Sequence, residues 1–417
     1  MRALLFLLAS EILYAQSGDW LFTLTEFGQP HYERAELKFD GDKITGRSGP
    51  LTLEGTIRQG GVEIAAKGSD GGLVGKLSGT LTDGEIKGNG MRGQNPFVFL
   101  GRRIKDRPAV PQTHQFTPTV FYNYFNSSAP PALIIFPGDT VESWSVDSGG
   151  MDAEGARRSP GGNPLTGPFY IEGAVPGDTL SIRFSRIRLT RDSAESGQRV
   201  SPAALEPRYL ARQPDVRGFN SSWTLDRQGG FARLSKPTGK LKDYRVPMKP
   251  MLGCVGVAPP QQQSLRSGDL GTFGGNMDYN GLVEGTTVYL PVYQPGALLY
   301  VGDGHAAQGD GELTGDALET STEWTFTVDV IHRSINQPRI ETAEYWIASG
   351  IANSLPEALQ SATTNLSRWL EEEYKLNPAE IGVVLGTSIR YEVAELVDPR
   401  VHVVAKIAKG LLAPIRK

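Results

Sequence analysis

The stretch VGDGHAAQGDGE (residues 301–312) carries two Gly-Asp-Gly triplets and one histidine. Asp303, His305, Asp310 and Glu312 alternate with glycines, which let the backbone turn sharply so that neighbouring side chains can converge. Carboxylate oxygens suit calcium and magnesium, and an added imidazole favours zinc, manganese or iron. The stretch therefore predicts a metal site, and a hairpin loop of solvated acids is the alternative that the stretch alone leaves open.

Two familiar glycine-rich loops do not fit this stretch. An EF-hand needs acidic residues at positions 1, 3 and 5 of its loop, and that spacing is absent. A dinucleotide-binding loop needs GxGxxG between a strand and a helix, which GDGHAAQG does not match. The stretch therefore matches neither an EF-hand loop nor a dinucleotide-binding loop.

Three further stretches add acidic and amide residues in glycine-rich surroundings. They are GTFGGNMDYNG (271–281), FPGDTVESWSVDSGGMD (136–152) and GNPLTGPFYIEGAVPGDTL (162–180). Asn276 and Asp278 follow a double glycine, Asp147 ends a strand-like run, and Glu172 lies in a loop. Each stretch also fits ordinary β-turn chemistry. Asp147, Asp278 and Glu172 are nevertheless candidates, because each follows glycine-rich or apolar backbone.

Together these stretches resemble the acetamidase/formamidase family of amide hydrolases. The matching elements follow the family's order: PGDTV (137–141), NPLTGPFYIEGAVPGDTL (163–180), MLGCVGVAPP (251–260), GGNMDYNGL (274–282) and VGDGHAAQGDGELTGDALET (301–320). The resemblance implies hydrolysis of formamide, acetamide or a similar small amide substrate to a carboxylate and ammonia. It also implies a mainly β fold with α/β elements, a divalent metal ion and a homo-oligomer, commonly a dimer.

The acidic residues and the histidine of these motifs are our candidates for holding the metal. The expected ligands are Asp147, Asp278, His305 and Glu312, with Asp310 as a further ligand. Asp303 and Asp316 are set aside as ligands. Zinc and calcium both fit this mixed set, so the identity of the metal stays open.

Catalytic roles are assigned to the remaining polar residues of these motifs. Glu172 or Glu319 is the expected general base. Asn276 and Gln308, or backbone N–H groups of the glycine loops, are expected to stabilise the oxyanion. Cys254 lies between glycines in LGCVGVAP and is interpreted as small core packing rather than as a nucleophile.

Two other functions remain open from the sequence. The chain could be an exported binding protein with a calcium-stabilised β scaffold and no turnover. It could also be a hydrolase of another linear or cyclic C–N bond. His305 argues against the first alternative, because a purely structural calcium site has little use for imidazole.

Composition shifts divide the 417-residue chain into parts. Residues 1–17 resemble a secretory signal peptide, which predicts a periplasmic or secreted protein. Residues 18–105 alternate apolar and polar residues between glycine turns and predict a small antiparallel β domain. Residues 106–417 form the expected catalytic domain, in which 190–250 is expected to run over the surface. The C-terminal portion is expected to be helical, with Ser354 capping a helix.

Charge and cysteine content limit the possible partners. The net charge is −4 and basic residues are scattered, so we expect no nucleic-acid binding. One cysteine excludes an intrachain disulfide framework. After the first residues no apolar run is long enough to span a bilayer, so we expect no membrane span.

Overall fold

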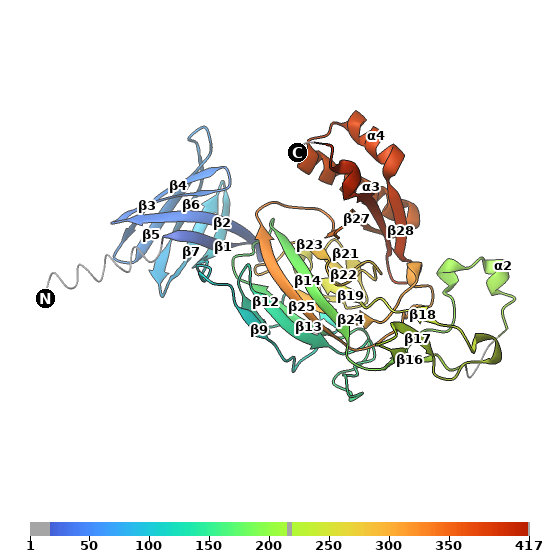
Figure 1. Ribbon diagram of the computed structural model, residues 1–417. Coiled ribbons are helices and arrows are strands. Elements are labelled where there is room, and N and C mark those ends of the chain that lie inside the picture. Colours follow the sequence, from blue (N-terminus) through green and yellow to red (C-terminus); the bar gives the residue numbers. More distant parts are fainter. Residues whose placement is uncertain (1–16, 215–218, 416–417) are drawn as a thin grey trace. The chain divides into compact units, whose positions relative to one another are not determined.

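A computed structural model describes residues 17–214 and 219–415 and divides the chain into two compact units, residues 1–107 and 108–417 (Figure 1). Residues 1–16 of the expected signal peptide lie outside the described residues. Within the described ranges, no helix combines the length and apolar character needed to cross a bilayer.

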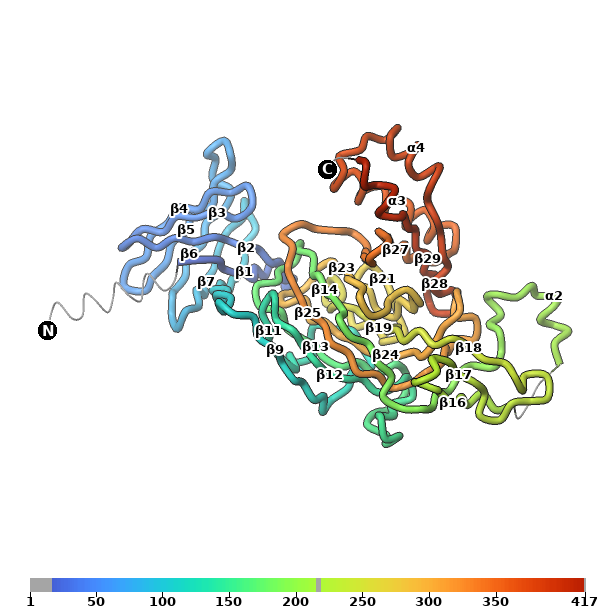
Figure 2. Tube along the Cα trace, viewed as in Figure 1, coloured from blue at the N-terminus to red at the C-terminus, as the bar shows by residue number. Residues whose placement is uncertain are grey.

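The N-terminal unit is a closed barrel of eight antiparallel strands, in which each strand pairs with the next and β1 pairs with β8 (Figure 2). The strands are β1 (Gly18–Glu26), β2 (Gln29–Asp40), β3 (Lys43–Ser48), β4 (Leu51–Arg58), β5 (Gly61–Lys67), β6 (Leu73–Thr82), β7 (Glu85–Arg92) and β8 (Asn95–Arg103). Alternate residues point inward, as Ala35, Leu37 and Phe39 of β2 do. Gly41 supplies the positive φ of the β2–β3 hairpin, as the DGDK turn predicts.

The second unit contains two large sheets. The six-stranded sheet has the order β11-β13-β24-β19-β22-β21, and the nine-stranded sheet has the order β28-β29-β27-β26-β23-β14-β25-β12-β9. The first comprises β11 (Leu133–Ile135), β13 (Leu165–Ile171), β24 (Leu299–His305), β19 (Met251–Gly256), β22 (Gly274–Asn276) and β21 (Leu270–Gly271). The second comprises β28 (Arg390–Glu395), β29 (Val401–Ala408), β27 (Tyr345–Ala352), β26 (Arg339–Glu341), β23 (Thr287–Pro291), β14 (Thr179–Leu189), β25 (Thr322–Ile331), β12 (Thr140–Ser145) and β9 (Thr113–Gln115).

Aromatic side chains join the two large sheets. The Phe169 ring of β13 lies 5.4 Å from the Phe326 ring of β25 and 6.1 Å from the Trp324 ring, both edge to face. These rings belong to one buried hydrophobic cluster that draws residues from both sheets. The sheets therefore pack face to face around an apolar core. This arrangement confirms the mainly β class.

Smaller elements complete the second unit. They are β10 (Tyr124–Phe125) paired with β20 (Leu265–Arg266), the four-stranded sheet β15 (Ser193–Glu195), β16 (Ser222–Asp226), β17 (Phe231–Leu234) and β18 (Val246–Pro247), helices α2 (Pro207–Leu210), α3 (Leu355–Tyr374), α4 (Pro378–Ser388) and α5 (Lys409–Leu412), and the 3₁₀ turns η1 (Pro202–Ala204), η2 (Gly239–Leu241), η3 (Pro260–Gln262) and η4 (Asp310–Glu312). The segment expected to run over the surface thus folds in part as a small sheet of its own.

The C-terminal portion carries the two longest helices among the residues that the structure describes. Ser354 caps α3, because its hydroxyl accepts a hydrogen bond from the Glu357 amide. The reciprocal capping box occurs in α4, between Asn377 and Glu380. Helix α3 buries its apolar face against β27 and β29. Gly350 of β27 allows this close packing, because a Cβ there would lie 2.1 Å from an α3 carbonyl oxygen.

Candidate active site

Three neighbouring strands of the six-stranded sheet bring the glycine-rich motifs together. Cys254 of β19 lies opposite Asn276 of β22 on one side and opposite Gly302 of β24 on the other. The chain segments that follow Asn276 and Gly302 therefore meet at one edge of these strands. They carry Asp278, and Asp303 with His305.

Four polar residues of this region adopt the left-handed backbone conformation that favours glycine. Their φ angles are 54° at Asn163, 40° at Asp278, 58° at Asp303 and 44° at Glu312. Such conformations cost free energy in non-glycine residues and concentrate at functional sites. Here they turn side chains from separate loops toward a common point.

His305 lies at the centre of the cluster. Its Nε2 atom is 3.2 Å from Glu319 Oε1, 3.5 Å from Asp303 Oδ1 and 3.9 Å from Asp278 Oδ1. The imidazole and all three carboxyl groups are buried. The backbone of Glu319 also bridges His305, which positions the two side chains together.

Gln308 fixes the orientation of the imidazole. Its Nε2 donates hydrogen bonds to the backbone carbonyls of Asp278 at 2.5 Å and Ala394 at 3.3 Å. Gln308 Oε1 therefore faces His305 Nδ1 at 2.9 Å and accepts its hydrogen. In the neutral ring, the Nδ1–H tautomer leaves the Nε2 lone pair directed at the carboxyl groups, as a metal ligand requires. Without a bound cation, Glu319 and Asp303 favour the protonated ring.

Several buried atoms of the cluster have no hydrogen-bond partner among the described residues. They are Asp278 Oδ1, Asp303 Oδ1, His305 Nε2 and Glu319 Oε2. Buried polar atoms are normally paired, so converging unpaired acceptors indicate a site for a cation.

Three groups of ligand atoms meet the distances that a metal ion needs. In each group the atoms lie within 4.8 Å of one another. The groups are Asp278–His305–Glu312, Asp303–His305–Glu319 and Asp278–Glu395–Asp398. The first two groups share His305, so one ion near its Nε2 would lie close to carboxylates of both groups.

Charge is strongly unbalanced in the cluster. Asp278, Asp303, Glu312 and Glu319 lie close to His305, and Glu395 and Asp398 lie close to Asp278. Within residues 17–214 and 219–415, no lysine or arginine forms an ion pair with any of them. The buried carboxyl groups must therefore be protonated, pair with a protonated His305 or face a bound cation, because isolated buried charges are costly.

The pKa values follow from this crowding. Burial, followed by the neighbouring carboxyl groups, raises the pKa of Asp278 well above its usual range. Burial raises the pKa of Glu312 as well, and it raises that of Glu319 to about 7. Burial lowers the pKa of His305, but Glu319 and Asp303 outweigh this effect and raise it well above the ordinary value. The site thus favours binding of positive charge.

Asn276 links the carboxyl groups but has no free N–H group. Its Nδ2 donates to Asp398 Oδ2 at 2.6 Å and to Asp278 Oδ2. Its Oδ1 accepts from Asn163 Nδ2 at 3.2 Å and from Cys254 Sγ at 2.8 Å. Asn276 and Gln308, both expected to stabilise an oxyanion, therefore use their N–H groups to hold the site together. Backbone N–H groups remain for that role.

Cys254 belongs to this polar network rather than to simple core packing. Its Sγ lies 3.7 Å from Asp303 Oδ2. Burial, then the nearby Asp303 carboxyl, raises the pKa of the thiol. The thiol therefore stays protonated and is a poor nucleophile, as the sequence suggests.

Two expected ligands lie outside the three groups. Asp147 forms an ion pair with Arg191 and accepts a hydrogen bond from the Met151 amide at 2.8 Å. It borders the cluster, because the next residue, Ser148, hydrogen-bonds to Glu319. Asp310 is exposed and accepts a hydrogen bond from Asn280 Nδ2 at 2.7 Å.

Glu172 lies at the far end of β13 from the cluster. Phe169 pairs with Leu299, and the chain runs from there away from Asp303. Along the paired strands β13 and β24, about seven residues, or roughly 20 Å, separate Glu172 from Asp303. Of the two expected general bases, only Glu319 contacts His305.

Four residues of the cluster were not selected from the sequence. Asp303 lies in the recognised motif VGDGHAAQGDGE but is not among the expected ligands. Asn163 opens a recognised motif, and its Nδ2 donates to Asp303 Oδ2 at 2.8 Å. Glu395 and Asp398 follow β28, and nothing in the local sequence distinguishes them from surface acids.

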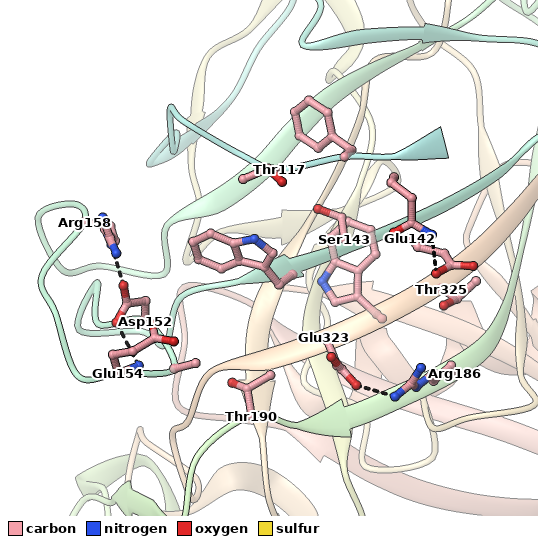
Figure 3. Close-up of a pocket in the computed structure, with 15 residues that line it drawn as sticks. Thr117, Glu142, Ser143, Asp152, Glu154, Arg158, Arg186, Thr190, Glu323 and Thr325 are labelled. Atoms are coloured by element: carbon pink, nitrogen blue, oxygen red, sulfur yellow. Dashed lines mark hydrogen bonds and ion pairs between the residues drawn. The ribbon is translucent and has the colours of Figure 1, made fainter. Parts of the chain in front are cut away.

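A hollow of about 640 Å³ reaches the cluster at Gln308 and Glu312. A second hollow, of about 440 Å³, lies on the nine-stranded sheet and has no residue in the cluster (Figure 3). Two of its four acids are paired with arginines, Asp152 with Arg158 and Glu323 with Arg186, and Glu142 accepts a hydrogen bond from Gln115. The first hollow is therefore the better candidate for substrate access.

Comparison with known proteins gives consistent matches. A sequence profile of the Acetamidase/Formamidase family matches residues 266–374. A formamidase of Methylophilus methylotrophus is 51% identical over 195 residues, which cover 36% of this chain and 47% of that protein. The chain spans less than half the length of the curated relatives that it matches.

Solved structures share the fold over most of the chain. An acetamidase of Yersinia enterocolitica superposes with a TM-score of 0.61 at 27% identity, covering 72% of this chain and 93% of that one. An acetamidase of Bacillus halodurans gives a TM-score of 0.60 at 26% identity, covering 73% and 100%. The profile match includes Asp278, His305, Glu312 and Glu319.

Proposed function

We propose that the chain hydrolyses short aliphatic amides at the cluster around His305, because its sequence and fold are similar to those of acetamidases and formamidases. Formamide and acetamide are the substrates we propose first. The observation that carries the proposal is the set of buried, unpaired acceptor atoms that converge beside His305 Nε2.

The residues present fit a divalent metal ion. We propose that Asp278, His305 and Glu312 hold it, because their ligand atoms lie within 4.8 Å of one another. Three protein ligands that include one imidazole match a catalytic zinc site, whereas calcium takes six to eight oxygens. When bound, such an ion supplies a Lewis acid that polarises an amide carbonyl and acidifies water.

The chain's own residues then move the protons. In the proposed reaction the amide C–N bond breaks and a C–O bond to water forms. Glu319 accepts one proton from the attacking water and passes it to the departing nitrogen, which leaves as ammonia. A pKa of about 7 suits Glu319 to both steps near neutral pH. Gln308 keeps the His305 ring in place throughout.

The test is ammonia release from formamide, acetamide and propionamide by the purified protein. Glu319→Gln should lower kcat at least 100-fold, because the amide cannot accept the proton. Glu344→Gln is the matched control, since Glu344 is exposed and lies outside both the cluster and the hollow. Equal kcat values for Glu319→Gln and the wild type would reject the assigned base.

Metal dependence separates this proposal from its rivals. Removal of metal with a chelator should stop ammonia release, and zinc should restore it. A folded, zinc-loaded protein that releases no ammonia but binds calcium tightly would instead support an exported calcium-stabilised binding protein. Turnover of a cyclic amide but of no linear one would support the other C–N hydrolase.

Assembly and location are further proposals. The family resemblance supports a homodimer, which light scattering of the purified protein tests. The sequence of residues 1–17 supports export to the periplasm or beyond. N-terminal sequencing of the mature protein should then begin near residue 18, whereas an intact Met1 in the exported fraction would contradict cleavage.

A further inference from the structure

The hollow beside the cluster is much larger than a short amide needs. Its volume is about 640 Å³. Acetamide takes up roughly the space of three water molecules, or about 90 Å³. Gln308 and Glu312 line the hollow and also belong to the cluster, so a substrate held there would reach the reacting centre.

The wall of the hollow is largely apolar and partly aromatic. The side chains that form it are Trp223, Tyr244, Val246, Ala307, Leu313 and Leu318. The Trp223 and Tyr244 rings lie 6.3 Å apart, edge to face. Trp223 Nε1 donates to Ser196 Oγ at 2.9 Å, which fixes the indole. Trp223 of the small sheet and Tyr244, which precedes β18, thus supply an aromatic surface to the hollow.

Charged side chains also line the hollow. The buried carboxyl group of Glu312 lies where ammonia, which becomes a cation when it leaves, would depart. Asp310, Asp316 and Lys249 line it as well and are exposed. An apolar acyl group gains from contact with the apolar part of the wall, whereas a second carboxylate on the substrate would meet three acidic side chains and one lysine.

We infer that the substrate is a primary amide whose acyl group carries a phenyl-sized or pentyl-sized apolar substituent, held against Trp223 and Tyr244. This inference rests on the proposed amide hydrolysis at the same site. It extends the substrate class beyond formamide and acetamide.

The experiment compares kcat/KM for acetamide, hexanamide and phenylacetamide, measured by ammonia release with zinc-loaded protein. We expect phenylacetamide and hexanamide to exceed acetamide at least tenfold, as burial of the substituent predicts. Tyr244→Ala and Leu313→Ser should each lower the phenylacetamide-to-acetamide ratio threefold or more. Both residues are exposed, so neither change should prevent folding.

Tyr209→Ala is the matched control, because Tyr209 is an exposed tyrosine that does not line the hollow. It should leave the ratio unchanged. Turnover of acetamide without turnover of the two larger amides would overturn this inference and leave the proposed function standing. Absence of turnover with all three amides would overturn both. If neither Tyr244→Ala nor Leu313→Ser lowers the phenylacetamide-to-acetamide ratio, the substituent does not bind against this wall and the inference is wrong.

Discussion

Gly253 lies on β19 directly behind two carboxyl groups of the cluster. A Cβ at this position would lie 2.3 Å from Asp278 Oδ1 and 2.7 Å from Asp303 Oδ2, whereas ordinary contacts begin at 3.4 Å. In Gly253→Ala the Asp278 carboxyl must therefore move by about 1 Å. A displacement of that size in an active site costs roughly 100-fold in rate, or about 3 kcal/mol of transition-state stabilisation.

The assay is kcat/KM for acetamide with zinc in excess, together with thermal unfolding to confirm that the variant folds. Gly268→Ala is the matched control, because a Cβ there meets no atom within 4 Å. We expect Gly253→Ala to lose about 100-fold and Gly268→Ala to remain near the wild type. Wild-type kcat/KM in Gly253→Ala would refute the argument that Asp278 must occupy its present position.

Three shorter predictions concern support of the site and of the fold. Gln308→Leu removes the hydrogen-bond acceptor of His305 Nδ1, so zinc affinity should fall 10- to 100-fold in chelator competition; unchanged affinity would contradict the orienting role. Burial lowers the pKa of His402 to about 4. As the pH falls, His402 is therefore protonated in the unfolded chain before it is protonated in the folded protein. Between pH 7 and pH 5 the unfolding free energy of the wild type should fall by about 2 kcal/mol from this cause, and that of His402→Gln should not. Urea titrations that show the same fall in both proteins would contradict this prediction. Gly350→Ala would place its Cβ 2.1 Å from an α3 carbonyl oxygen, and should lower the unfolding free energy by about 1–3 kcal/mol; an unchanged urea midpoint would contradict tight packing.

Local sequence patterns predicted much of the secondary structure. Alternating residues and glycine turns identified the N-terminal β domain, because a strand with one buried face repeats every two residues. They did not show that β1 pairs with β8, since closure depends on strands far apart in sequence. Helix α3 was recognised from its Ser354 cap and apolar spacing.

Only part of the candidate site could be predicted from the sequence. Asp278, His305, Glu312 and Glu319 lie in glycine-rich motifs whose sequence is distinctive, and the structure brings them together. Asp303 lies in the same motif as His305, but the local sequence does not distinguish a buried aspartate from a solvated one. Its burial became visible only with strand β24 in place.

Long-range contacts account for what the sequence did not show. Glu395 and Asp398 reach Asp278 from the C-terminal part of the chain, and Arg191 draws Asp147 into an ion pair. No pattern in neighbouring residues encodes such contacts. Asp147 as a ligand and Glu172 as a base therefore stay predictions that the geometry does not favour.

The most direct test of the account is the metal content of the purified protein, measured by mass spectrometry beside its ammonia release from acetamide. The account predicts one divalent ion per chain in the wild type, and loss of both the ion and the activity in His305→Ala. Full ammonia release by a wild-type protein that has been stripped of metal, or an unchanged metal content and activity in folded His305→Ala, would contradict it.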